Sequence, residues 1–179
     1  RNSMKKVTCV HKSNVMRITD GLFAKACVDV SKDYPDISFE EMYVDACAMN
    51  LIRQPEKFDV IVTTNLFGDI LSDESSQVVG GLGMAPAANI GDNFALFEPV
   101  HGAAFDIAGQ NIANPSSFLL SIKMMLDWLG VKHNDPKCFE VANKLESTIF
   151  DLVKSGVKTK DIGGDKTTIE FTKYITDNL

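Results

Sequence analysis

Apolar residues follow two different periods along this chain, one typical of helices and one typical of strands. Over residues 15–33 they recur at every fourth position, which predicts a helix. These positions are Ile18, Leu22, Ala26 and Val30. The run at residues 59–63, Asp-Val-Ile-Val-Thr, instead predicts a strand buried on both faces, and β-branched residues 7–10 predict a shorter one. This alternation is typical of an α/β protein.

Capping residues indicate where further helices begin. Ser38 and Glu41 have the spacing of a capping box and predict a helix to about residue 51. Thr167 and Glu170 have the same spacing and predict a final helix. Asn-Pro at 114–115 and Asp-Pro at 135–136 predict two longer helices between them. A helix over 68–79 and a strand over 94–97 complete the expected elements.

One shift in composition predicts a domain boundary. The segment 80–91 is rich in Gly and Ala and follows a predicted helix. We therefore expect one domain over residues 1–79 and a second over residues 80–179.

Composition and charge exclude several classes of protein. The chain has 179 residues, of which 45% are hydrophobic and 23% charged, as in ordinary globular proteins. Its net charge is −6 and no basic run is present, so we expect no nucleic-acid partner. No apolar run reaches the roughly 18 residues of a membrane span, and residues 1–6 lack the apolar core of a signal peptide. Four cysteines without a C-x-x-C pair indicate reduced thiols and a cytoplasmic protein.

Two carboxylates at helical spacing form the first candidate site. Asp69 and Asp73 are four residues apart, so on a helix they lie on one face and repel each other. Mg²⁺ or Mn²⁺ would relieve that repulsion, because hard divalent cations prefer carboxylate oxygens. The alternative is that acidic residues near a helix N-terminus simply favour its dipole.

Two other segments carry candidate chemistry. Lys12 follows a predicted strand and could act as a base, although a solvated lysine is the simpler interpretation. His11 is better explained as a hydrogen-bonded structural histidine, and Asp45 as a solvent-facing carboxylate. In the loop 98–114, Asp106 could accept hydrogen bonds from a ribose, or the loop could be an ordinary surface segment. Residues 81–83, Gly-Leu-Gly, follow a helix and lack the third glycine of a Rossmann fingerprint.

Taken together, four segments resemble one enzyme family. They are His-Lys-Ser-Asn at 11–14, Tyr-Val-Asp at 43–45, Asn-Leu-Phe-Gly-Asp-Ile-Leu-Ser-Asp at 65–73, and the run from Glu98 to Pro115. In order and spacing they are similar to the metal-dependent β-decarboxylating dehydrogenases, which include the isocitrate, 3-isopropylmalate and homoisocitrate enzymes. The resemblance implies an α/β, isopropylmalate dehydrogenase-like fold, not a Rossmann fold, with a mixed sheet flanked by helices.

The resemblance also implies a role for each candidate residue. Asp69 and Asp73 would bind Mg²⁺ or Mn²⁺. Asp45, as a catalytic residue from the partner subunit of a homodimer, would contact both the metal and the substrate. Lys12 would enter the active site across the same interface, as the base or proton relay for the substrate hydroxyl. Asn14 would lie near it and contact substrate or nicotinamide. The cofactor-binding residues would be His101, Gly102, Ala103, Asp106, Ile107 and Asn114. Members that use NADP commonly have Lys-Tyr in place of Asp106-Ile107, so NAD is expected here.

The implied reaction is oxidative decarboxylation of a small malate-type 2-hydroxy acid. 3-Isopropylmalate, and hence leucine biosynthesis, is favoured, with isocitrate or homoisocitrate next. The chain resembles only the C-terminal half of such an enzyme: residues 1–79 would belong to the substrate and dimer-interface domain, and residues 80–179 to the cofactor domain. The arginines that bind substrate and the general-acid tyrosine belong to the other half, so we expect this chain alone to be inactive. The alternative is a non-catalytic regulatory or assembly subunit.

Overall fold

A computed structural model describes residues 4–179. Residues 1–3, part of the segment 1–6 that is expected not to be a signal peptide, lie outside the described residues. The chain divides into two compact units, one ending at Val78 and the other running from Val79 to Leu179.

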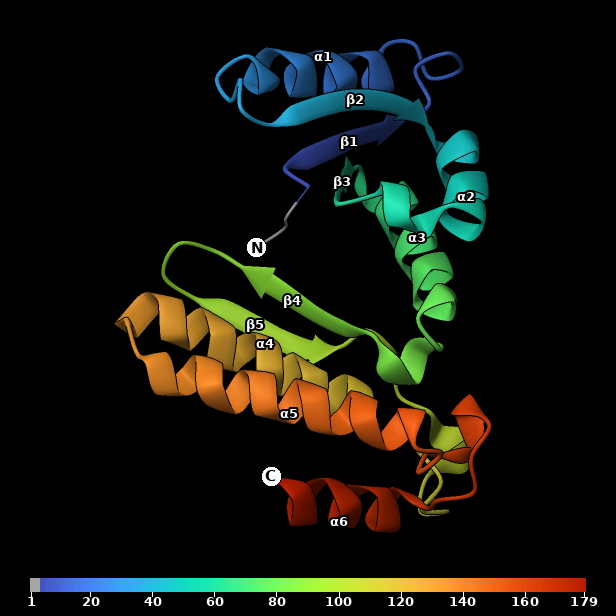
Figure 1. Ribbon diagram of the computed structural model, residues 1–179. Coiled ribbons are helices and arrows are strands. Elements are labelled where there is room, and N and C mark those ends of the chain that lie inside the picture. The colour runs from blue at the N-terminus through green and yellow to red at the C-terminus, as the bar shows by residue number, and fades with distance from the viewer. Residues whose placement is uncertain (1–3) are drawn as a thin grey trace. The chain divides into compact units, whose positions relative to one another are not determined.

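The first unit is built on a three-stranded parallel sheet with the strand order β2-β1-β3. The strands are β1 (Lys6–His11), β2 (Ser38–Tyr43) and β3 (Val60–Thr63). Helix α1 (Thr19–Ser31) lies on one face, and α2 (Val44–Arg53) and α3 (Asn65–Val78) lie on the other (Figure 1). Parallel strands with helical connections confirm the predicted α/β class.

The two faces of this sheet are packed differently. On the α2–α3 face, Val10, Cys47, Leu51 and Leu71 form a buried apolar cluster. On the α1 face an apolar cavity of about 500 Å³ remains between the helix and the strands. The expectation that β3 is buried on both faces is therefore wrong: Val60 faces this cavity and is 43% exposed.

One predicted helix start is also wrong. Ser38 and Glu41 do not cap a helix, because residues 38–43 form β2 and pair with β1 from Lys6 to His11. The helix begins only at Val44, after the strand has ended. Two other bounds differ less: α1 begins four residues later than the apolar period suggested, and α3 begins at Asn65 instead of 68.

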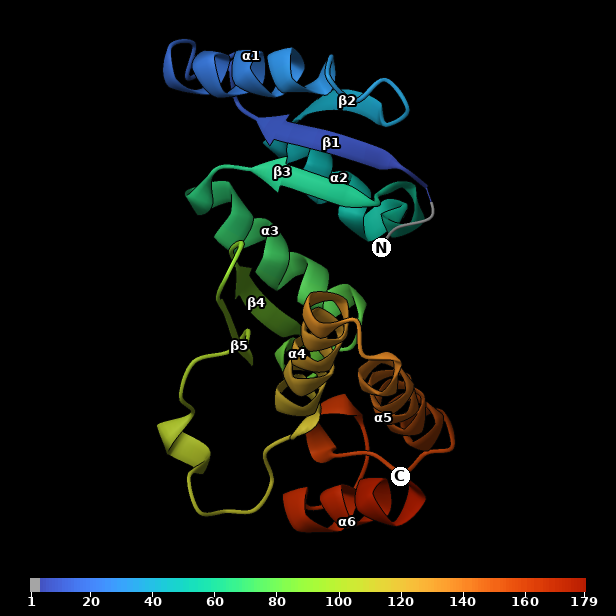
Figure 2. The ribbon, with the colours of Figure 1, turned by 90° about the vertical axis from the view of Figure 1, so that its left-hand side faces the viewer.

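The second unit combines a β-hairpin with three helices. The hairpin pairs β4 (Pro86–Ile90) with β5 (Ala95–Pro99) in antiparallel register. Strand β4 was not predicted from the sequence. The helices are α4 (Ser116–His133), α5 (Pro136–Lys154) and α6 (Thr168–Asn178). Figure 2 shows α4 between the hairpin and α5. Within the described chain the sheet of the first unit is thus parallel and the hairpin of the second unit is antiparallel.

A closed apolar core holds the second unit together. Its buried members come from all three helices and from the turn before β4; they are Met84, Leu120, Leu145, Ile149, Phe171 and Ile175. The predicted caps at two helix starts are confirmed. Asp135 accepts from the main-chain N–H of Lys137 at 3.0 Å, and Thr167 with Glu170 forms a complete capping box.

The thiols in the described chain are free, as the spacing predicted. Burial, followed by the neighbouring Cys27, raises the pKa of Cys9 to about 12, and burial raises the pKa of Cys47 to about 11. Within residues 4–179, no helix combines the length and apolar character that crossing a membrane requires.

Candidate active site

The candidate residues of the first unit follow the carboxyl ends of its strands. β1 ends at His11, β2 at Tyr43 and β3 at Thr63, and all three strands run in parallel. Their carboxyl ends therefore meet at one edge of the sheet, which is where open α/β sheets bind their ligands. Lys12 and Asp45 emerge at this edge, and α3 begins there two residues after β3.

Lys12 and Asp45 form a direct ion pair at this edge. The Lys12 Nζ lies 2.5 Å from Asp45 Oδ1 and 5.6 Å from the centre of the Tyr43 ring. The Lys12 side chain is 23% exposed and that of Asp45 is 68% exposed. The hydrogen bond from Lys12, helped by main-chain N–H groups at the start of α2, lowers the pKa of Asp45. The pair keeps an ammonium group fixed beside solvent-accessible space.

His11 shapes the turn next to this ion pair. Its buried imidazole accepts a hydrogen bond at Nδ1 from the N–H of Ser13, 3.2 Å away, and its ring meets the Tyr43 ring edge-on. Nε2 lies 3.2 Å from Glu41 Oε1, but their directions do not form a hydrogen bond. His11 is thus a buried, hydrogen-bonded side chain, as expected. Asn14, two residues along the turn from Lys12, is exposed.

Asp69 and Asp73 lie on successive turns of α3 and are both exposed. No side chain or main-chain group of residues 4–179 donates to either carboxylate; Ser72 and Ser76 bond instead to the main-chain oxygens of these two residues. Two unpaired carboxylates one turn apart repel each other, and a divalent cation with oxygen ligands suits such a pair. The donor set therefore fits Mg²⁺ or Mn²⁺.

Asp45 does not complete a metal cluster with these two residues inside one chain. Over residues 4–179, no three or more His, Cys, Asp or Glu side chains are arranged to hold a metal ion. The structure thus brings Asp45 together with Lys12, and leaves Asp69 and Asp73 as a separate pair.

The candidate cofactor loop lies in the second unit and is largely exposed. It contains a short 3₁₀ turn at Phe105–Ile107, and Gly109 has a φ of +75°. The Asp106 main-chain oxygen accepts from Gln110 Nε2 at 2.7 Å, whereas its carboxylate binds no group in the described chain. His101 Nδ1 lies 3.0 Å from the Gly102 oxygen, Ala103 is exposed, and Ile107 is half-buried. Asp106 is thus free to accept hydrogen bonds from a ligand.

The far end of this loop is fixed by hydrogen bonds. Asn114 Nδ2 donates to Asp161 Oδ2 at 3.0 Å, and its Oδ1 accepts from the N–H of Ser116 at 2.9 Å. A Cβ at Gly83 would lie 2.8 Å from Asp161 Oδ2, so only glycine fits there without a shift. Both polar atoms of Asn114 are therefore already used by the protein.

Two residues of these sites gave no signal in the sequence. Asp20, in the first turn of α1, is buried and accepts from the main-chain N–H of Lys12. Asn111 anchors the loop to α6, because its main-chain oxygen and Oδ1 accept from the N–H groups of Thr168 and Ile169. Asn111 has a positive φ of 58°, a conformation that asparagine tolerates better than most residues. This is the one feature of the two residues that is linked to a residue type.

Comparison with solved structures defines the class of protein. The fold matches the crystal structure of isocitrate dehydrogenase from Methylococcus capsulatus with a TM-score of 0.89 and 43% identity, covering 97% of this chain and 50% of that one. Residues 1–179 match the family described as isocitrate/isopropylmalate dehydrogenase. The chain belongs to that family.

Individual relatives are similar along nearly the whole chain. 3-Isopropylmalate dehydrogenase of Sulfurisphaera tokodaii is 56% identical over 176 residues, which are 98% of this chain and 52% of that enzyme. Homoisocitrate dehydrogenase of Methanocaldococcus jannaschii is 52% identical, covering 100% of this chain and 50% of that enzyme. The chain spans about half the length of the curated relatives that it matches.

Proposed function

We propose that the whole protein containing this chain is an NAD-dependent, metal-dependent β-decarboxylating dehydrogenase. Its substrate would be a malate-type 2-hydroxy acid, with 3-isopropylmalate favoured and isocitrate or homoisocitrate next. The observation that carries the proposal is the Lys12–Asp45 ion pair at the carboxyl edge of a parallel sheet, in a chain that also has two unpaired carboxylates on α3. The names of its relatives support the substrate class.

In this proposal the residues of the chain move and hold protons. Lys12, as the neutral amine, would accept the substrate hydroxyl proton, directly or through a relay, and the ammonium group so formed would pair with Asp45. Asp69 and Asp73 would hold Mg²⁺ or Mn²⁺, which would supply Lewis acidity for the reaction. Asn14 contacts substrate near Lys12. We assign Lys12 and Asp45 to one subunit of a homodimer, and the α3 carboxylates of the same site to the other.

The exposed Asp106 carboxylate is proposed to select NAD. It would accept hydrogen bonds from both ribose hydroxyls, and it would repel the 2′-phosphate of NADP. His101, Gly102, Ala103, Ile107 and Asn114 would form the rest of the adenosine site, where Asn114 fixes the end of the loop. The free thiols support a cytoplasmic location.

A chimera tests the function directly. This chain would replace the matching segment of the Sulfurisphaera tokodaii enzyme, so that the other half comes from the relative. We expect the chimera to form NADH from 3-isopropylmalate with Mg²⁺, and Lys12→Ala to lower kcat by about 100-fold or more. Lys5→Ala, at an exposed position outside the site, is the control.

The same chimera separates this function from the alternative. A chimera that folds and dimerises but forms no NADH would contradict the proposal and favour a non-catalytic assembly subunit. The 179-residue chain alone should show no turnover, because it lacks the other half of the enzyme.

A further inference from the structure

The turn that carries Lys12 is held by main-chain hydrogen bonds. The oxygen of Lys12 accepts from the N–H groups of Val15 and Met16, each at 2.9 Å, and the Met16 oxygen accepts from the N–H of Asp20 at 3.1 Å. These bonds connect the end of β1 to the first turn of α1. They leave the N–H of Lys12 itself without a main-chain partner, because β1 pairs with its neighbours only as far as His11.

The side chain of Asp20 accepts that remaining hydrogen bond. Its Oδ2 lies 2.6 Å from the Lys12 nitrogen, and the residue is only 4% exposed. In the described chain the carboxylate forms no ion pair and no other hydrogen bond. A buried carboxylate is costly unless it is hydrogen-bonded, and a bond from N–H to a charged oxygen is stronger than a neutral one. This buried charge therefore acts on one group, the main chain of Lys12.

Lys12 is consequently held at both ends by carboxylates from different helices. Asp20 at the start of α1 fixes its main chain, and Asp45 at the start of α2 fixes its ammonium group. We propose that Asp20 is a positioning residue for the reaction, which sets the place of the Lys12 amine by fixing the turn from which the side chain extends. This inference rests on the role of Lys12 in the proposed function. Displacements of about 1 Å can cost 100-fold in rate, so the turn has to be held closely.

Three variants of the chimera test the proposal. Asp20→Ala removes the acceptor, and we expect kcat to fall by about 10-fold to 100-fold with little change in KM for NAD. Asp20→Asn keeps an acceptor oxygen at the same place and should recover most of that kcat. Asp33→Ala, at an exposed position just after α1, is the matched control and should leave kcat unchanged.

A second measurement does not depend on activity. In the ¹⁵N-labelled 179-residue chain, the Lys12 amide should exchange slowly with solvent, and Asp20→Ala should speed its exchange at least about tenfold. The amide of Val10, inside β1, serves as the internal reference, because it should keep its protection if the sheet remains folded. Loss of protection at Lys12 alone would support a local effect of Asp20.

The outcomes separate this proposal from the function on which it rests. If Lys12→Ala abolishes turnover but Asp20→Ala leaves kcat and Lys12 exchange unchanged, the Asp20 proposal is overturned and the function stands. If Asp20→Asn is as slow as Asp20→Ala and both lose protection at Val10, Asp20 is only structural, which also overturns it. If Lys12→Ala keeps full activity, the proposed function fails, whatever the exchange data show for the turn.

Discussion

The two units of the chain bury their apolar residues to different extents. The second unit closes its core around Ile149, Phe171 and Ile175, each at most 1% exposed. The first unit has a buried cluster on one face of its sheet and a cavity of about 500 Å³ on the other. Yet the first unit carries the Lys12–Asp45 pair and the α3 carboxylates. The candidate residues at the strand ends therefore lie in a unit whose sheet is densely packed on one face only.

The largest expected contrast is between two matched Phe→Ala substitutions. Phe171→Ala removes a fully buried ring from the second core and should lower the free energy of unfolding by about 3–5 kcal/mol. Phe23→Ala removes a ring that lines the cavity of the first unit and should cost less than about 1.5 kcal/mol. Urea unfolding followed by Trp128 fluorescence reports the second unit, and amide exchange reports the first. Similar losses at both sites would contradict the comparison.

A smaller contrast comes from adding volume on a helix of each unit. Ala142 in α5 is fully buried, so Ala142→Leu should overpack the core and cost about 1–3 kcal/mol. Ala26 in α1 borders the cavity, so Ala26→Leu should be neutral or stabilise by up to about 1 kcal/mol. Thermal unfolding of the two variants measures both effects. A fall in stability with Ala26→Leu would mean that the cavity has no room for the added side chain.

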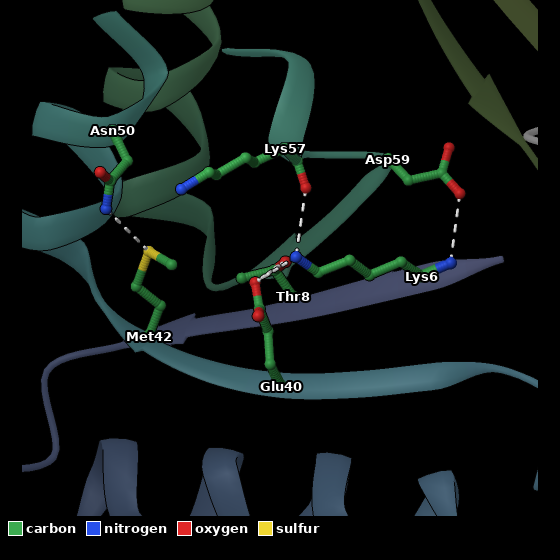
Figure 3. A network of polar contacts seen from close by, with 7 residues as sticks. All are labelled: Lys6, Thr8, Glu40, Met42, Asn50, Lys57 and Asp59. Carbon is green, nitrogen blue, oxygen red and sulfur yellow. Dashed lines mark hydrogen bonds and ion pairs between the residues drawn. The ribbon is translucent and has the colours of Figure 1, made fainter. Parts of the chain in front are cut away.

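The smallest expected contrast is in pH dependence. Burial acts to raise the pKa of Glu40, but hydrogen bonds from Lys6 and Thr8, at 2.9 and 2.8 Å, outweigh it and lower the pKa (Figure 3). Burial acts to lower the pKa of Lys123, but hydrogen bonds to Asp127 and Glu146 on α4 and α5 outweigh it and raise the pKa.

The two shifts have opposite consequences for stability. Glu40 stabilises the first unit above its usual pKa of 4.5, and this contribution is lost as pH falls through the lowered value. Lys123 stabilises the second unit below pH 10.5, the usual pKa of lysine. This contribution is lost as the pH rises through the raised pKa of Lys123. In a plot of the free energy of unfolding against pH, Glu40→Gln should reduce the pH dependence only on the acid side. Lys123→Gln should reduce it only on the alkaline side, and each effect should be less than about 1 kcal/mol. Effects on the opposite sides would refute the assignment.

The spacing of a capping box predicted a helix start correctly in the second unit and wrongly in the first. Thr167 and Glu170 cap α6, where the helix is decided by local bonds. Ser38 and Glu41 lie in β2, because β1 offers a complete row of main-chain partners and Glu40 bonds to Thr8, 32 residues away in sequence. Local patterns identify elements that local bonds stabilise. They fail where a distant strand supplies the main-chain partners, as β1 does for β2.

The candidate site was predictable only in part. Lys12 was expected after a strand, and Asp69 and Asp73 on one helix face, because these depend on neighbours in sequence. The contact between Lys12 and Asp45 was not derivable from spacing, since it follows from the β1–β2 register. Asp20 left no pattern at all, because its partner is a main-chain N–H that every residue but proline possesses.

The strand order of the first unit also bears on how fast each unit folds. β1 lies between β2 and β3, and Thr63 on β3 meets Val10 across 53 residues of chain. Helices α4 and α5, by contrast, are consecutive and separated only by Asn134 and Asp135. Domains with distant pairings fold more slowly, because long loops must close before any contact forms. The α4–α5 pair is therefore expected to form early, and the sheet edge that carries Lys12 to be completed only when β3 joins β1.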